Sequence, residues 1–400
     1  MIVRIKSLGQ LKDTSIELGD LTVIFGKPNS GKSYVLKGIY SKLAFFDQAN
    51  NPELAGIIVD RIRDELVNIA EKVVKEGKAE ASIDITEHFI SSLDLLSERV
   101  SKALLTNSEI EVGEESKIRE LTYKSLKSYT LPPRPYSSYD SSCVAGTYIG
   151  FSKGELMVKV KGSGCELCKV RVALELISHV TSFLLILIPQ IMNEVSIAVG
   201  IPSVRFLPYG RSLILLYGDS IRPIPYTKSL IYWVKKGIEE VRKGNVDNFW
   251  GIRLQIADKL TINGLEPSYV SSSLLELATI SLVLADNRKS LLLIEEPESH
   301  LSMDYQIKMG LYLYMLSKEH KVVVTTHSEA LISILSILAH YKKVREIGEY
   351  FGVKLDGVRD VRIYHTKGEK IELVKPEDLL EEIPDITNVH YDILKVIAKV

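Results

Sequence analysis

The sequence predicts an α/β protein of the P-loop NTPase class, and two segments carry this prediction. The segment GKPNSGKS, residues 26–33, follows the strand-like run LTVIF and precedes a run with helical periodicity. The segment LLLIEEPESHL, residues 291–301, has the pattern of a buried strand followed by three acids. From 271 to 335 the expected order is helix, strand, helix, strand, helix, which is typical of an α/β fold.

The composition is that of a globular protein with no general affinity for polyanions. The chain has 400 residues and a formal net charge of −1, and it is 46% hydrophobic and 25% charged. This balance gives no overall attraction to nucleic acid or to an anionic membrane. The most apolar stretch, residues 182–192, is too short to span a bilayer, and no basic leader followed by an apolar run is visible. We therefore expect a cytoplasmic protein without a membrane partner.

The three cysteines are too few for a disulfide framework. Cys165 and Cys168 form a C-x-x-C pair downstream of Cys143, and no second pair of Cys or His ligands lies nearby. Because a structural zinc site needs four ligands, we interpret these residues as ordinary thiols at a turn between strands. A redox pair and a zinc site shared between two chains stay open as alternatives.

The amino-terminal half alternates strands and helices. Three strand-like runs occupy the first 26 residues, and a helix follows over residues 34–47. Residues 53–130 have a helical and strongly charged pattern, and residues 128–142 form a loop rich in Pro and Ser. The runs VAGTYIG, ELMVKVK and CKVRVA predict an antiparallel meander, and a long apolar helix is expected over about 172–198.

The carboxyl-terminal half begins with SVRFLPYGRS, which predicts a strand that ends at Pro208. Helices are expected again over about 227–260, and VRIYHTKGEKIELV, residues 361–374, predicts a hairpin. The predicted organisation has five parts: an amino-terminal lobe (1–50 and 140–226), a helical insertion (51–139), a helical subdomain (227–275), a carboxyl-terminal core (276–340) and a helix with a hairpin (341–400).

The residue types of the segment 26–33 are those that bind a polyphosphate. Gly26 and Gly31 allow a tight turn that directs backbone N–H groups at the phosphates, and the following helix adds the positive end of its dipole. Lys32 reaches the β- and γ-phosphates, and Ser33 supplies a hydroxyl to Mg²⁺. The sequence therefore predicts an ATP site with Mg²⁺, whose loop residues are Gly26, Lys27, Pro28, Asn29, Ser30, Gly31, Lys32, Ser33 and Tyr34.

The acids of LLLIEEPESHL place like charges together at the end of a buried strand, and a bound cation would explain why they are tolerated there. Carboxylates crowded at one place raise each other's pKa unless a cation lies among them. In P-loop enzymes a second apolar strand ends in an acid beside the phosphates and the metal. This alignment places Glu295 at Mg²⁺ and Glu296 at the attacking water as general base, whereas Glu298 belongs to the loop beyond Pro297.

Two further segments are candidates for contacts with the γ-phosphate. KVVVTTHS, residues 321–328, is an apolar strand that ends at His327, and this side chain can hold the attacking water. Taken alone, a histidine at a strand end is more often structural. Ser271, Ser272 and Ser273 open a helix, where they provide an anion site or only a helix cap.

These motifs together resemble those of ABC-type ATPases, in particular the RecF-, SMC- and OLD-like branch that includes prokaryotic "AAA family ATPases". GKPNSGKS is similar to the G-x-N-x-x-G-K-S loop of that group, and IEEPESHL is similar to its D-E-P-E-x-H-L segment, with Glu295 in place of Asp. TTHS resembles its switch-histidine strand, and RFLPYGRS resembles its L-P-A-x-R-S strand. The resemblance covers residues 1–45 and about 200–335. It implies an ABC-ATPase-like head with a mixed sheet, an antiparallel β subdomain and a helical insertion.

The resemblance also implies partners and further site residues. It implies a head-to-head homodimer in which Ser272 contacts the ATP of the other subunit and His300 lies near the subunit contact. The signature reads S-S-S-L-L-E and departs from the usual Ser-Gly-Gly. Arg211 is the candidate near the nucleotide in place of a Q-loop glutamine. The roughly 60 residues after the His327 helix show no acidic cluster, so we expect no TOPRIM nuclease domain.

Three functions fit these observations. The first is an ATPase whose hydrolysis switches a dimer between closed and open states. The second is an ATP-sensing module of low turnover that recruits a separate effector protein. The third is a DNA-maintenance or defence ATPase, for which contact with DNA follows from the resemblance and not from the composition.

Overall fold

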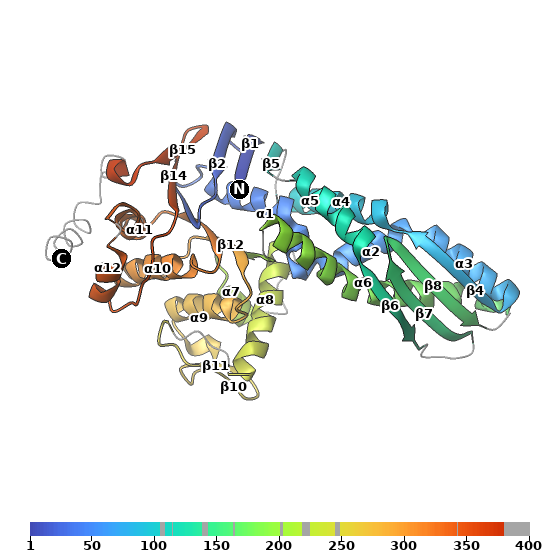
Figure 1. Cartoon of the computed structure of the whole chain (residues 1–400). Helices are drawn as coiled ribbons and strands as arrows, with labels where there is room; N and C mark the ends of the chain where they lie inside the picture. The colour runs from blue at the N-terminus through green and yellow to red at the C-terminus, as the bar shows by residue number, and fades with distance from the viewer. Residues whose placement is uncertain are drawn as a thin grey trace. The chain divides into compact units, whose positions relative to one another are not determined.

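The computed structural model describes residues 1–379 except 105–108, 114, 138–142, 163–164, 201–202, 218–224, 245–248 and 342. The chain forms two compact units (Figure 1). Unit 1 consists of Met1–Leu43, Val100–Gly113 and Pro202–Val400, and unit 2 consists of Ala44–Arg99 and Glu114–Ile201.

Unit 1 is built on a six-stranded sheet with the order β15-β14-β3-β13-β12-β9. Neighbouring strands are parallel except for β14 and β15, which form an antiparallel hairpin, so the expected mixed sheet is confirmed. The strands are β3 (Leu21–Phe25), β9 (Ser203–Leu207), β12 (Ser290–Glu295), β13 (Lys321–Thr326), β14 (Val361–Lys367) and β15 (Lys370–Val374).

Helices cover both faces of this sheet because its central strands are apolar on both sides. Helix α1 (Lys32–Leu43) lies against β12 and β13, and its Tyr40 ring packs 5.3 Å from that of Phe206 on β9. The main core of unit 1 forms with α8 (Pro225–Arg242), α9 (Ser272–Leu284), α10 (Met303–Leu316) and α11 (Glu329–Tyr341). Alternate residues of β3, Leu21, Val23 and Phe25, point into this core.

Smaller elements complete unit 1. A three-stranded antiparallel sheet has the order β2-β1-β5 and a hairpin is formed by β10 and β11. The bounds are β1 (Ile2–Leu8), β2 (Leu11–Glu17), β5 (Glu109–Val112), β10 (Leu254–Ile256), β11 (Leu260–Ile262), α7 (Leu213–Tyr217) and α12 (Val344–Tyr350).

Unit 2 is an antiparallel sheet of order β4-β8-β7-β6 with helices packed against it. The long helix α6 contacts α2, α3 and α5 as well as β7. The bounds are α2 (Asn51–Arg61), α3 (Arg63–Glu76), β4 (Lys78–Asp84), α4 (Thr86–Leu104), α5 (Glu115–Ser128), β6 (Thr130–Tyr136), β7 (Val144–Ser152), β8 (Glu155–Gly162) and α6 (Lys169–Val199).

Several sequence-based predictions of local structure are wrong. The charged segment 53–130 contains β4 and β5 as well as helices, and CKVRVA forms the start of α6 and not a strand. The Pro-rich segment is the edge strand β6, where prolines are tolerated because one side of an edge strand needs no N–H donors. Residues 138–142 of the expected loop lie outside the described residues. Part of the expected helical stretch 227–260 is the β10–β11 hairpin.

The cysteines also differ from the prediction. Cys143 and Cys168 form a disulfide with Cα atoms 5.6 Å apart, and Cys165 is a free, exposed thiol. Cys165 and Cys168 of the C-x-x-C segment therefore do not act together, because Cys168 is bonded to Cys143, the residue before β7. Within the described part of the chain, no group of three or more His, Cys, Asp or Glu residues is arranged to hold a metal.

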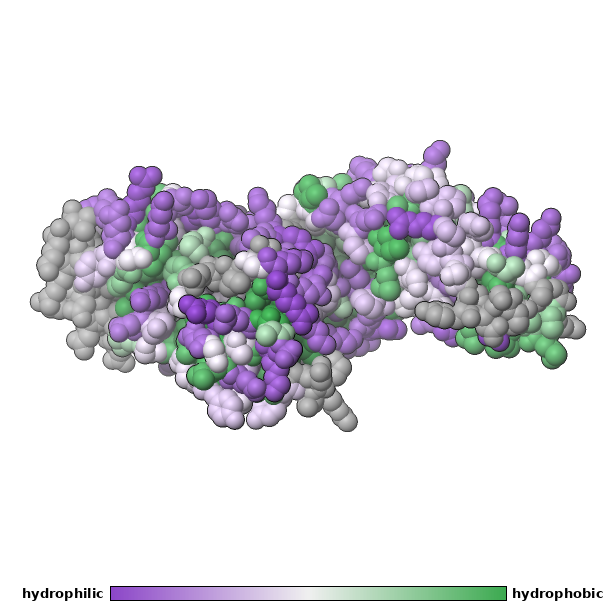
Figure 2. All heavy atoms as spheres, turned by 90° about the horizontal axis from the view of Figure 1, so that it is seen from below, coloured by the Kyte–Doolittle hydropathy of each residue, from purple (hydrophilic) through white to green (hydrophobic). Residues whose placement is uncertain are grey.

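Helix α6 is long and apolar enough to cross a membrane by length and composition. Half of its most apolar 18-residue window is buried inside the protein, as in the core helix of a folded domain. The face drawn in Figure 2 is mainly hydrophilic, with smaller hydrophobic areas. The helix is therefore weak evidence for a membrane contact, and the cytoplasmic location stays a prediction.

Candidate nucleotide-binding site

The parallel strands bring the predicted site residues to one edge of the sheet. Phe25 of β3 pairs with Thr326 of β13, and Thr325 pairs with Glu295 of β12. The segments that leave these three strands are the phosphate loop, the acids and His327. The structure therefore brings the three predicted elements together at the carboxyl ends of neighbouring strands, where α/β proteins bind ligands.

The phosphate loop has the backbone conformation that its glycines predict. Gly26, Asn29 and Gly31 have φ values of 146°, 60° and 91°, in the region that L-residues rarely adopt. The amide-rich tip is open to solvent, because Lys27, Pro28 and Asn29 are exposed. Tyr34, the first exposed aromatic residue of α1, is 43% exposed.

Lys32 lies inside the loop that it is predicted to serve. Its Nζ donates to the carbonyl oxygens of Gly26 at 2.9 Å and Lys27 at 2.8 Å, and it lies 3.4 Å from Ser30 Oγ. Burial lowers the pKa of Lys32, and the nearby carboxylates of Glu296 and Glu298 oppose this shift. The Lys32 ammonium is thus held by carbonyl oxygens of the phosphate loop, which a bound anion could replace.

Glu295 has the properties expected of a metal ligand. It is 4% exposed, its Oε2 accepts from the backbone N–H of Tyr209 at 3.0 Å, and the Ser33 hydroxyl acts to lower its pKa. Its Oε1 is buried and has no hydrogen-bond partner. Burial raises the pKa of the Glu295 carboxyl, which a bound cation would reverse. The paired hydroxyl and orphaned carboxylate oxygen fit Mg²⁺, which in such sites takes few protein ligands and the phosphates of the substrate.

Glu296 and His327 form a pair at the open side of the site. Glu296 Oε1 lies 2.7 Å from His327 Nε2, and the two side chains are 26% and 35% exposed. Glu296 has a φ of 42°, which is uncommon for a residue with a Cβ. Strain of this kind is found where a side chain must be aimed, and here it turns Glu296 toward His327.

Glu298 holds the segment that carries His327. Its Oε1 accepts from Thr326 Oγ1 at 2.6 Å, from the His327 N–H at 2.9 Å and from the Ser328 N–H at 3.3 Å. The side chain is 8% exposed, and burial raises its pKa. Glu298 is therefore a positioning residue, a role that the sequence did not reveal because the donors lie 28 to 30 positions away.

Arg211 is buried and does not reach toward the phosphate loop. Its guanidinium donates to the carbonyl oxygens of Pro208, Glu295 and Glu296 at 2.9, 2.7 and 2.9 Å. Its Nε lies 3.0 Å from a carboxylate oxygen of Glu276 on α9, and both side chains are 0% exposed. These contacts tie Arg211 to the backbone of the acids, and its place near the nucleotide stays a prediction.

The serines at the start of α9 lie at the surface. Ser271 caps the helix by accepting from the Leu274 N–H, and Ser272 is exposed. The Ser273 hydroxyl donates to the carbonyl oxygen of His300, so the helix start is tied to the loop that follows the acids. None of these contacts joins Ser272 to the phosphate loop, which is compatible with a role toward a second subunit.

Among the comparisons with known proteins, the family match covers the segment that carries the acids and His327. Residues 218–332 match the family model of the AAA ATPase domain, and no curated protein matches the sequence. One solved structure, the Smc head bound to the C-winged helix domain of ScpA, is 12% identical, covers 95% of this chain and 98% of its own, and has a TM-score of 0.38. The Thermotoga maritima SMC head domain is 11% identical, with coverages of 94% and 97% and a TM-score of 0.33. The recombination mediator protein RecF is 11% identical, with coverages of 93% and 97% and a TM-score of 0.33.

These values are too low for the solved structures to say anything about function. The class follows from the chain itself and from the family match. One mixed sheet carries three features side by side: the phosphate loop after β3, His327 after β13 and the acids at the end of β12. The segment with the acids matches an ATPase domain model. The fold and the segment that matches the AAA ATPase domain are those of an ATP-binding ATPase with a phosphate loop.

The first prediction concerns Glu298. Replacing Glu298 with Ala leaves buried N–H and O–H donors unpaired, so the free energy of unfolding falls by about 2–3 kcal/mol. Phosphate release from ATP falls as well, because the His327 segment loses its anchor, whereas Glu298→Gln keeps the acceptor and most of the activity. Thermal unfolding and phosphate release measure the two effects. Glu319→Ala at an exposed position is the matched control, with a change within about 0.5 kcal/mol. Equal effects of Glu298→Ala and Glu298→Gln would contradict this role.

The second prediction concerns the buried pair of Arg211 and Glu276. Arg211→Met leaves the buried Glu276 carboxylate without a cation, with only the Ser212 hydroxyl as partner, and lowers the free energy of unfolding by about 3–5 kcal/mol. Adding Glu276→Gln to this variant restores part of the loss, because the unpaired charge is removed. Denaturant unfolding measures both variants. Lys236→Met at the exposed Lys236–Glu239 pair costs no more than about 1 kcal/mol. A loss of that small size for Arg211→Met would contradict the interpretation.

Proposed function

We propose that this protein binds and hydrolyses Mg·ATP, and the observation that supports this most is the Glu296–His327 pair beside the phosphate loop. A nucleotide carrier alone needs the loop and a metal ligand. It does not need a carboxylate and an imidazole 2.7 Å apart at the open side of the site. Such a pair is suited to holding a water molecule and accepting its proton.

The chain's own residues divide the work of hydrolysis. The amides of residues 26–33 and Lys32 bind the phosphates, and Lys32 exchanges the carbonyls of Gly26 and Lys27 for phosphate oxygens. Ser33 and Glu295 would hold Mg²⁺, which neutralises charge on the phosphates when bound. Glu296 accepts the proton of the attacking water, and His327 orients that water toward the γ-phosphate. Arg211 holds the backbone of Glu295 and Glu296, and Glu298 holds the backbone of His327.

A head-to-head homodimer is part of this proposal. The start of α9 is solvent-exposed at Ser272 and is linked through Ser273 to the carbonyl of His300. In a dimer of this type the serines of one subunit close on the ATP of the other, so each site is complete only when ATP is bound. The cycle of closing and opening would serve DNA maintenance or defence in the cytoplasm, through DNA or an effector protein.

The alternative is an ATP sensor of low turnover that recruits a separate effector. The signature segment S-S-S-L-L-E supports it, because it lacks the paired glycines that let a backbone approach a γ-phosphate closely. The two proposals differ in turnover and not in affinity, so the same experiment separates them.

The third prediction tests hydrolysis. Wild type releases phosphate from Mg·ATP, and Glu296→Gln lowers this rate by about 100-fold or more while ATP affinity stays within about threefold. His327→Ala lowers the rate as well, and the double variant is no slower than the slower single variant because the two side chains act as a unit. If wild type binds ATP but releases no phosphate, with or without DNA, the sensor is correct and the ATPase proposal fails.

The fourth prediction tests the dimer. In the Glu296→Gln background, ATP converts monomer into dimer, and Ser272→Arg prevents this because it places a long cation at the exposed start of α9. Sedimentation velocity with and without Mg·ATP is the measurement. Ser182→Arg, at an exposed position of α6, is the matched control and leaves the dimer intact. A monomer in all three proteins at saturating ATP contradicts the head-to-head arrangement.

A further inference from the structure

The carboxyl-terminal hairpin reaches the phosphate loop although it lies outside every motif of the sequence. Strand β14 is the parallel neighbour of β3 on the side away from β13. His365 of β14 pairs with Phe25 of β3, the residue that precedes the loop, and their rings stack 4.4 Å apart. The next residue of β14 is Thr366, which is 4% exposed and faces the loop.

Thr366 lies against Phe25, which precedes the phosphate loop, and against Gly26 and Ser30 of the loop itself. Its Oγ1 donates to the carbonyl oxygen of Phe25 at 3.1 Å and lies 2.5 Å from Ser30 Oγ. A Cβ on Gly26 would lie 2.1 Å from Thr366 Oγ1, so the strand occupies the space that a side chain at position 26 would need. Gly26 is therefore required for the approach of β14 as well as for its φ of 146°.

The hydrogen bonds define one consistent arrangement of protons. A hydroxyl has a single proton. Thr366 gives its proton to Phe25, so the bond between the two hydroxyls is a donation from Ser30 to Thr366. Ser30 then has its lone pairs free to accept from Lys32 Nζ, which lies 3.4 Å away. The chain Lys32–Ser30–Thr366–Phe25 links the phosphate-binding lysine to β14.

We propose that Thr366 is a positioning residue of the ATP site, which fixes the hydroxyl of Ser30 and thereby the conformation of the phosphate loop. This inference rests on the proposed binding of ATP and not on hydrolysis. Thr366 does not touch the acids, so its loss changes the affinity of the loop for phosphates more than the rate of the chemical step.

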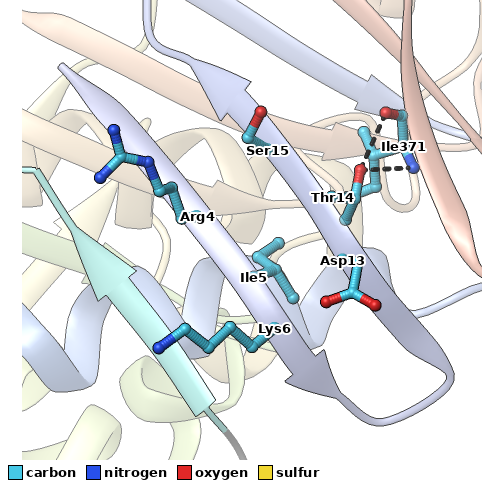
Figure 3. Close-up of a pocket in the computed structure, with 7 residues that line it drawn as sticks. All are labelled: Arg4, Ile5, Lys6, Asp13, Thr14, Ser15 and Ile371. Atoms are coloured by element: carbon cyan, nitrogen blue, oxygen red, sulfur yellow. Dashed lines mark hydrogen bonds between the residues drawn. The ribbon is translucent and has the colours of Figure 1, made fainter.

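The hairpin provides a matched control. Thr14 of β2 binds the other strand of the hairpin, β15, by donating to the Ile371 carbonyl and accepting from the Ile371 N–H, both at 3.1 Å. Figure 3 shows these two bonds at the rim of a pocket of about 490 Å³ on the β1–β2 sheet. Thr14 thus holds the same hairpin through its hydroxyl but has no contact with the phosphate loop among the bonds described.

The experiment compares Thr366→Val, Thr366→Ser and Thr14→Val with wild type. Thr366→Val keeps the shape of the side chain and removes the hydroxyl, so the Kd for Mg·ATP and the KM rise about tenfold while kcat stays within about twofold. Thr366→Ser restores the hydroxyl and returns the Kd to within about twofold of wild type, and Thr14→Val also stays within about twofold.

Amide hydrogen exchange of the nucleotide-free proteins supplies a readout that does not depend on ATP. Peptides that cover residues 26–33 exchange faster in Thr366→Val and at the wild-type rate in Thr366→Ser and Thr14→Val. Unchanged exchange in Thr366→Val, or an equal increase in Thr14→Val, overturns the role of Thr366. A wild type that binds ATP without releasing phosphate overturns the hydrolysis proposal alone, and both readouts of Thr366 keep their meaning in that case.

Discussion

The parallel pairing of β3, β13 and β12 is the constraint on which the site depends. In this register Phe25, Thr326 and Glu295 end their strands at one edge, so the segments that follow must meet there. Side chains alternate between faces along a strand, and a slip of one residue would move every side chain to the opposite face. The residues of these strands are almost all buried, so the strands are anchored on both faces. Glu296 and His327 can therefore be polar and partly exposed, because the strands before them are fixed in the core.

The same edge of the sheet contains a buried ion pair between Arg211 and Glu276. Glu276 on α9 is 0% exposed, and the guanidinium of Arg211 joins it to the carbonyls of Glu295 and Glu296. A buried ion pair adds little stability compared with apolar side chains, but it is sensitive to geometry. A shift of α9 therefore has to move the backbone of both acids. This arrangement links α9, which begins with the surface serines, to Glu295 and Glu296 through Glu276 and Arg211.

The sequence predicted what depends on local pattern and missed what depends on distant contacts. The phosphate loop, the acids and the 361–374 hairpin have local signatures of turn chemistry and periodicity, and the structure places them as expected. Glu298, Glu276 and Thr366 have no such signature, because a buried carboxylate or hydroxyl has a role only once its partners are known. The short strand β5 was missed for a related reason. Its residues EIEV look like part of a charged helix, and only pairing with β1 makes them a strand.

The site also contains a buried polar atom that the protein itself does not satisfy. Glu295 Oε1 is buried without a partner, and Lys32 bonds to the carbonyls of its own loop. An unpaired buried oxygen costs free energy, and burial lowers the pKa of Lys32 although the carboxylates of Glu296 and Glu298 oppose this shift. In the proposed function, Mg²⁺ would supply a cation to Glu295, and phosphate oxygens would replace the carbonyls at Lys32. Mg·ATP would then stabilise the folded state by mass action, so the affinity for Mg·ATP and the stability of unit 1 would be linked. Thr366 and Arg211 contact different parts of this site, because Thr366 bonds to Ser30 of the phosphate loop and Arg211 bonds to the backbone of Glu295 and Glu296.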